Sequence, residues 1–219
     1  SAVFVDANVG TGKSVTVIGY AAPSSNYSIT QPTGLTADIT AASLTVTASA
    51  QSKTYGSTSP TSGTLNTNFT VTGLQGTDVA SGATLSYSGT PAGNIASASI
   101  GSYTITPSAL TLSSGSASNY SISYVPGTLT VNTASLTITG ISISNKTYNG
   151  NATASITGTA AYSGLVNSES FTVTGTPSAV FADANVGTGK SVTVSGYTAP
   201  SSNYSITQPT GLTANITKA

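Results

Sequence analysis

The sequence predicts an all-β fold made of several small domains in tandem, and three observations support this prediction. Apolar and hydroxyl residues alternate along many short segments, a pattern typical of half-buried strands. Turn-forming glycine, proline and asparagine residues separate these segments at short intervals. Residues 1–42 also return almost unchanged as residues 178–219, which indicates a modular array rather than a single globular enzyme.

Strands are expected wherever β-branched residues take part in the alternation. The clearest such segments are Leu44–Thr47, Tyr103–Thr106, Leu136–Thr139 and Val192–Ser195. The expected turns between strands are Pro60, Gly63, Gly73, Gly89–Pro91, Pro126–Gly127, Asn149–Gly150 and Pro209–Gly211. A period of two with one apolar face is typical of antiparallel sheets. We therefore expect small antiparallel β-domains, sandwich-like or β-grasp-like, in an elongated array.

The internal repeat predicts the domain organisation. Residues 1–42 are expected to be the second half of one module, residues 43–133 a complete module of another type, and residues 134–219 a complete module of the first type. The chain is thus read as a slice of a longer repetitive protein. Because no long linker separates the modules, we expect a stiff rod. The apolar face of 1–42 needs a cover, from a neighbouring chain or from preceding sequence.

Substitutions between the two copies test the strand assignment. Aligning Ser1 with Ser178 leaves five differences, at Val5/Ala182, Ile18/Ser195, Ala21/Thr198, Asp38/Asn215 and Ala41/Lys218. A core position would not exchange isoleucine for serine, since burying an unpaired hydroxyl costs about 1–3 kcal/mol. Position 18/195 is therefore expected to face outward, and Ile18 is a candidate contact between modules or between chains.

Composition excludes several classes of function. Charged residues make up 5% of the chain, against about 25% in average globular domains. The five basic residues are all lysines, too few for a nucleic-acid surface or a polybasic membrane anchor. No apolar run approaches a membrane span, so membrane insertion is not expected. Weak repulsion between uncharged surfaces favours self-association.

No catalytic, cofactor-binding or metal-binding residue is predicted. The chain has no histidine and no cysteine, which rules out a serine-type triad and thiolate metal sites. Residues Ala7–Ser14, repeated at 184–191, resemble a relaxed P-loop, but an alternating strand pattern follows where a helix is required. We expect a hairpin turn there instead. Asp6-Ala7-Asn8 and its copy Asp183-Ala184-Asn185 predict Asx-turns rather than a calcium site.

Tyrosines recur beside turn signals. Lys53–Gly56 and Lys146–Gly150 are interpreted as turns in which tyrosine packs across the turn and bonds the backbone. Asn26-Tyr27, Asn119-Tyr120 and Asn203-Tyr204 are interpreted as anchors between a turn and a strand. Lys146 and Glu169 are a pair to inspect for an intramolecular isopeptide bond.

The second module resembles the MBG adhesin-repeat domain of bacteria. The features that carry this resemblance are Leu44–Ala48, Lys53–Gly56, Val71–Leu74, Gly101–Ile105, Ser118–Ile122 and Val125–Val131. Module 134–219 is similar to the related YDG domain, on the strength of Lys146–Gly150, Asn185–Gly187 and Asn203–Ile206. Tyr-Asn-Gly at 148–150 stands where that family commonly has Tyr-Asp-Gly. The resemblance implies stalk domains in large secreted or surface-anchored bacterial adhesins, without catalytic residues.

We therefore expect a non-enzymatic stalk or spacer segment of an extracellular adhesin on the bacterial cell surface. Its expected partners are neighbouring repeat modules of the same protein. One alternative is a subunit that self-associates into an extracellular filament or sheath. Another is a module that binds carbohydrate or host protein, with Tyr20 or Tyr197 as an exposed platform.

Overall fold

A computed structural model describes all residues, 1–219, and nearly all of its regular structure is β-strand. The only helical element is the short 3₁₀ helix η1 (Ala117–Asn119). No helix of the structure is long and apolar enough to cross a membrane. The all-β prediction is confirmed. The chain forms two compact units: residues 1–50, 61–86 and 105–127 form the first, and residues 51–60, 87–104 and 128–219 form the second.

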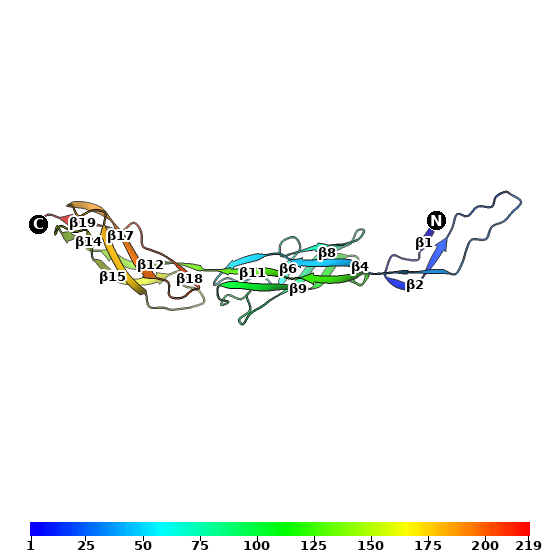
Figure 1. Cartoon of the computed structure of the whole chain (residues 1–219), viewed down its shortest axis with the longest axis horizontal. Helices are drawn as coiled ribbons and strands as arrows, with labels where there is room; N and C mark the ends of the chain where they lie inside the picture. Colours follow the sequence, from blue (N-terminus) through cyan, green and yellow to red (C-terminus); the bar gives the residue numbers. More distant parts are fainter. The chain divides into compact units, whose positions relative to one another are not determined.

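The first unit holds two three-stranded sheets, with strand orders β1-β2-β3 and β10-β4-β7. Their strands are β1 (Ala2–Phe4), β2 (Gly10–Val17), β3 (Leu35–Ile39), β4 (Ala42–Ala48), β7 (Phe69–Thr72) and β10 (Tyr120–Val125) (Figure 1). A five-stranded sheet has the order β5-β11-β9-β8-β6. Its strands are β5 (Gln51–Thr54), β6 (Ser62–Thr64), β8 (Val79–Tyr87), β9 (Gly101–Ser114) and β11 (Gly127–Asn132).

The core of the first unit is formed by apolar residues that alternate with threonines along β4. Leu44, Val46 and Ala48 of β4 are buried, while the threonines between them face the other side. These side chains pack with residues of β7, β8, β9 and β10, namely Phe69, Ala80, Ala83, Leu110 and Tyr120. Because the cluster combines side chains from two sheets, the packing is sandwich-like.

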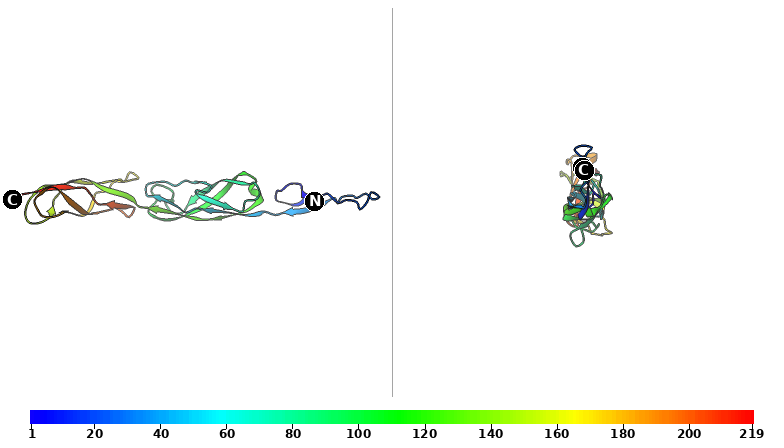
Figure 2. Two further views of the ribbon diagram at one scale, coloured as in Figure 1. Left: turned by 90° about the horizontal axis from the view of Figure 1, so that it is seen from above. Right: turned by 90° about the vertical axis from the view of Figure 1, so that its right-hand side faces the viewer.

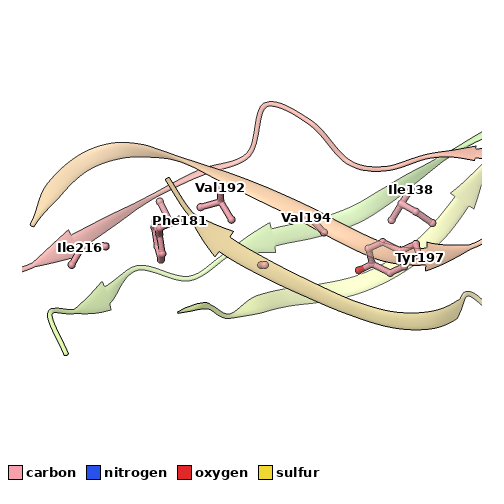
Figure 3. Packing of buried hydrophobic residues seen from close by; sticks show 8 residues of the cluster. Ile138, Phe181, Val192, Val194, Tyr197 and Ile216 are labelled. Carbon is pink, nitrogen blue, oxygen red and sulfur yellow. The ribbon is translucent and has the colours of Figure 1, made fainter. Parts of the chain in front are cut away.

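The second unit holds a three-stranded sheet, β15-β12-β18, and a five-stranded sheet, β13-β19-β17-β16-β14. Their strands are β12 (Ala134–Ile143), β13 (Lys146–Thr147), β14 (Thr153–Ala154), β15 (Ile156–Ser163), β16 (Thr174–Phe181), β17 (Gly187–Thr198), β18 (Tyr204–Thr207) and β19 (Thr213–Thr217). Ile138 of β12 packs with Phe181, Val192, Val194 and Ile216 of the larger sheet. Figure 3 shows these side chains between the strands, with Tyr197 at one end of the cluster.

Strand pairing is mixed rather than purely antiparallel, which corrects one part of the expected fold. Four pairs are parallel: β4 with β10, β5 with β11, β12 with β18, and β13 with β19. The remaining pairs with a defined register are antiparallel. The period of two reports which face of a strand is buried, and it carries no information about strand direction.

The two copies of the repeated segment differ in structure. Residues 204–207 form β18, which pairs with β12, whereas the identical residues 27–30 form no strand. Figures 1 and 2 show the segment between β2 and β3 as a long loop that stands clear of other strands. The apolar residues of the first copy are largely exposed, as the prediction of an uncovered face requires.

Candidate functional site

A single carboxylate, that of Glu169, accepts hydrogen bonds from two tyrosines that lie far apart in the sequence. The Tyr55 hydroxyl donates to Oε1 at 2.6 Å, and the Tyr204 hydroxyl donates to Oε2 at 2.5 Å. The two rings meet edge to face, with centroids 5.5 Å apart and planes at 85°. We call Tyr55, Glu169 and Tyr204 the tyrosine clasp.

Secondary structure positions all three side chains. Tyr55 follows β5, and its N–H donates to the carbonyl of Asn132 at 2.8 Å. Tyr204 is the first residue of β18, opposite Ala134 of β12. Glu169 closes a turn in which its N–H donates to the Val166 carbonyl. The Val166 N–H in turn donates to the Tyr204 hydroxyl at 3.1 Å, so this hydroxyl both donates and accepts.

Burial and the shared carboxylate keep both tyrosines protonated. Desolvation, and then the hydrogen bond to Glu169, raise the pKa of Tyr204 to about 12. The same two causes raise the pKa of Tyr55. Both hydroxyls therefore remain donors at any physiological pH. With its two oxygens bound to tyrosines, the carboxylate holds the chain together rather than acting as a free base.

Further contacts surround the clasp. The Asn203 side-chain oxygen accepts the N–H of Ile100 at 3.0 Å, and the Asn167 amide donates to the Ala96 carbonyl at 3.3 Å. Gly56 has a φ of +90°, and a Cβ there would lie 2.6 Å from Val166. Glycine is required at this position, because only a residue without a side chain lets Val166 approach so closely.

The first unit repeats part of this arrangement. The Tyr120 hydroxyl donates to Oδ2 of Asp78 at 2.6 Å and accepts the N–H of Gln75 at 3.0 Å. The Asn119 side-chain oxygen accepts the N–H of Val9 at 2.9 Å, as that of Asn203 does from Ile100. Asp78 has one tyrosine partner, where Glu169 has two.

Tyr55 lies in a turn as predicted, but the prediction that its hydroxyl bonds the backbone was wrong. Its hydroxyl reaches Glu169, 114 residues away, a contact that local turn chemistry does not encode. Tyr120 and Tyr204 begin β10 and β18 as predicted, whereas Tyr27 begins no strand. Sequence reasoning missed the roles of Asp78 and Glu169. A signal was present, because each follows a Gly-Leu pair by four residues in a chain with only five acidic residues.

Lys146 and Glu169 do not meet, so the structure contradicts the isopeptide hypothesis. The Lys146 ammonium donates to the Asn151 and Thr153 carbonyls at 2.8 and 3.1 Å, and also to the Asn151 side chain. Glu169 is bound to the two tyrosines instead. In the first unit no comparable ammonium–carboxylate pair involves Asp78.

The P-loop-like segments begin in hairpin loops, as predicted, and continue into strands. The loops join β1 to β2 and β16 to β17, which are antiparallel pairs. Residues 10–17 and 187–198 form β2 and β17, and each register shifts where a bulge forms around Gly12 or Gly189. Only the second glycine of each segment has a positive φ, of 58° and 61°. The lysine that a P-loop would place on phosphate pairs with an aspartate, Lys13 with Asp6 and Lys190 with Asp183.

Both predicted Asx-turns are confirmed. The Asp6 carboxylate accepts the N–H of Asn8 at 2.8 Å, and Asp183 accepts that of Asn185 at 2.7 Å. The hydrogen bond from the neighbouring lysine, and then the backbone bond, lower the pKa of each aspartate. No three histidine, cysteine, aspartate or glutamate side chains gather as metal ligands.

The other sequence-predicted residues lie on the surface or in the core. Ile18 and Ser195 are both exposed, so this position faces outward in each copy. Tyr20 is exposed, but its counterpart Tyr197 is 6% exposed and packs in the core, as Figure 3 shows. Tyr197 is therefore not a binding platform.

Comparison with known families identifies the two modules. A model of the MBG domain (YGX type) matches residues 44–130, and a YDG domain model matches residues 132–211. The chain contains an MBG domain followed by a YDG domain. No curated protein and no solved structure matches it. Both domain types are found in adhesin-like repeat proteins, so the chain is a structural repeat module. The tyrosine clasp joins Tyr55 of the MBG domain to Glu169 and Tyr204 of the YDG domain.

Proposed function

We propose that the chain is a stiff stalk or spacer segment of a large extracellular bacterial adhesin. The two domain matches supply the structural role, and the tyrosine clasp supports the stiffness. The carboxylate of Glu169 in the YDG domain binds tyrosines from both domains, and the Asn203 side chain beside it accepts the Ile100 N–H of the MBG domain. Hydrogen bonds to a charged group stabilise by about 1.5–3 kcal/mol, more than neutral ones.

The clasp is the observation that carries this proposal, because it buries one tyrosine ring from each domain against a shared carboxylate. Tyr55 is 4% exposed and Tyr204 is 4% exposed. Separating the domains would expose both rings and leave their hydroxyls without the carboxylate. The free-energy cost of that separation restricts bending, so orientation passes from one domain to the next.

Distance measurements between labels test the stiffness. The chain has no cysteine, so Thr104→Cys and Thr193→Cys place two spin labels on exposed strand positions of the MBG and YDG domains, both within the second compact unit. We expect a narrow distribution of distances that broadens when Glu169→Ala removes the clasp. Asp78→Ala is the matched control, because it removes the equivalent carboxylate of the MBG domain, and it should leave the distribution narrow. Equal breadth in all three proteins would contradict the proposal.

The extracellular location and the absence of enzymatic activity belong to the same proposal. The support is the adhesin-like setting of both domain types, together with a composition that lacks cysteine, methionine and histidine. Antibody labelling of intact bacterial cells that produce the parent protein tests the location. Surface labelling without permeabilisation is expected. Labelling only after permeabilisation would contradict it.

A second candidate function, self-association into a filament, is favoured by the exposed apolar residues of the first copy. Val3, Val5, Ile18 and Leu35 are all at least 43% exposed. Light scattering at rising protein concentration tests it, with Ile18→Ser as the variant, since serine is the residue that the second copy carries. Self-association that weakens in the variant is expected. A monodisperse protein at every concentration would exclude the filament.

A further inference from the structure

The turns Gln75–Asp78 and Val166–Glu169 are equivalent, but only Glu169 has a hydrogen-bond donor on each of its carboxylate oxygens. In each turn the first residue donates its N–H to a tyrosine hydroxyl, and the acidic residue three positions later accepts from that hydroxyl. Tyr55 occupies the remaining oxygen of Glu169. No donor within the chain reaches the remaining oxygen of Asp78, which is Oδ1.

A cavity of about 400 Å³ lies beside Asp78. Its lining includes Asp78, Asn119 and Tyr120 of the MBG domain, together with Ile39 and Thr40 at the end of β3. The lining is part apolar and part hydrogen-bonding, as a tyrosine side chain requires. In the second unit, Tyr55 holds the corresponding position next to Glu169 and Tyr204.

The free edge of β3 is a pairing site for a strand that carries such a tyrosine. In the YDG domain, β13 pairs in parallel with β19, opposite Ile216 and Thr217, and the Tyr148 N–H donates to the Thr217 carbonyl. In the first copy, the residues equivalent to Ile216 and Thr217 are Ile39 and Thr40. Strand β3 pairs only with β2, so its other edge has no strand partner. Tyr55 follows β5 in the same way, with its N–H on Asn132.

We propose that this cavity receives the tyrosine of a Lys-Thr-Tyr strand from a further YDG domain, so that Asp78 completes a second tyrosine clasp. The incoming strand pairs with the free edge of β3, and its tyrosine hydroxyl donates to Asp78 Oδ1. The proposal deepens the proposed stalk function and rests on it. It assigns a tyrosine clasp to the boundary from a YDG module to an MBG domain as well as to the boundary from an MBG domain to a YDG domain.

Two further contacts support this assignment. The Asn119 side chain accepts the N–H of Val9, as Asn203 accepts that of Ile100. The asparagine contact that accompanies the first clasp is therefore already formed beside Asp78. The YDG domain of this chain also presents a complementary donor. Tyr148 is 45% exposed, and neither its hydroxyl nor the N–H of Val186, the counterpart of Val9, forms a hydrogen bond within the chain.

Adding the missing strand to the full chain tests the proposal. A copy of residues 134–177 is placed ahead of Ser1, which repeats the order seen before Ser178. Hydrogen exchange of the Gln75 amide is the reporter, because this N–H binds the Tyr120 hydroxyl. We expect exchange to slow roughly tenfold, as a new bond to a charged group would produce. The control carries phenylalanine in place of the added tyrosine, and it should not slow exchange.

The possible outcomes separate this proposal from the stalk function. If the Val15 and Val17 amides become protected while Gln75 behaves alike with tyrosine and phenylalanine, the second clasp is overturned and the repeat organisation stands. Asp78→Asn should abolish the difference between the tyrosine and phenylalanine extensions. A difference that persists in this variant would also overturn the role of Asp78.

A peptide provides a second test in case the extension does not fold onto residues 1–42. The peptide spans residues 144–151 and is added to the 219-residue chain, beside a version with phenylalanine for Tyr148. Slower exchange at Gln75 with the tyrosine peptide alone is expected. Equal effects of the two peptides, or no effect of either up to their solubility limit, would overturn the proposal.

Discussion

Phe4 and Phe181 hold the same position in two nearly identical segments, yet Phe4 is 37% exposed and Phe181 is 2% exposed. The contrast extends along the copies: Tyr27 is 67% exposed, whereas Tyr204 is 4% exposed and begins β18. The second copy packs against strands β12, β14 and β15, which come from residues 134–163. The first copy has no such strands.

Contacts that lie within the repeated segment are the same in both copies. Lys13 pairs with Asp6 as Lys190 pairs with Asp183, and the N–H of Gly12 binds residue 38 as that of Gly189 binds residue 215. The local bulge and Asx-turn are thus encoded by the segment itself. Strand β18 and the buried core depend on partners from elsewhere in the chain.

The largest expected effect comes from removing the buried ring of the second copy. Phe181→Ala should lower the free energy of unfolding of the YDG domain by about 3–5 kcal/mol, because it leaves a cavity in the core. The matched variant Phe4→Ala should change it by less than about 0.5 kcal/mol. Chemical denaturation measures both. Equal losses would mean that the first copy is packed in solution like the second.

The next effect concerns the two carboxylates. Glu169→Gln should cost about 2–3 kcal/mol, since two tyrosine hydroxyls lose their charged acceptor. Asp78→Asn should cost about half as much, because a single hydroxyl depends on it. Unfolding of each variant by denaturant gives the comparison. A larger cost at Asp78 would show that the turn alone, and not the second tyrosine, sets the stability.

Alkaline pH should distinguish the buried tyrosine from its exposed copy. The pKa of Tyr204 is about 12 in the folded chain, against a usual value of 10.0. The group's stabilising contribution is thus complete below pH 10 and is lost as pH rises toward 12, by roughly 2 kcal/mol. Tyr204→Phe should reduce this loss, whereas Tyr27→Phe should leave it unchanged. An identical pH profile for both variants would contradict the assignment.

The smallest effect is expected at the ion pairs, whose aspartates are exposed and whose geometry is nearly identical in both copies. Lys190→Met and Lys13→Met should leave the unfolding midpoint unchanged, since exposed pairs stabilise little. Each should raise the pKa of its aspartate toward the usual value, because the lysine hydrogen bond is the main cause of the lowering. Titration followed by NMR measures this. Unequal shifts at Asp6 and Asp183 would show that distant strands influence the bulge.

The sequence predicted what neighbouring residues determine. Alternation located β4, β9, β12 and β17, and the Asx-turns followed from Asp-x-Asn. Strand direction was not predictable, because side-chain periodicity is the same in parallel and antiparallel pairs. The tyrosine clasp was missed because two of its members, Tyr55 and Glu169, lie 114 residues apart. Comparing the acidic residues of the two modules by their position after Gly-Leu would have indicated it.

Hydrogen exchange at residues 27–30 and 204–207 tests the central claim most directly, since the two segments have the same sequence in one molecule. Peptides that begin at Ala21 or at Thr198 differ in mass by the extra CH2O of threonine, so the two copies can be told apart. The amides of 204–207 should be strongly protected by β12, while those of 27–30 should exchange at rates close to those of an unstructured chain. Equal protection of both segments would contradict the claim that strands outside the repeat determine its structure.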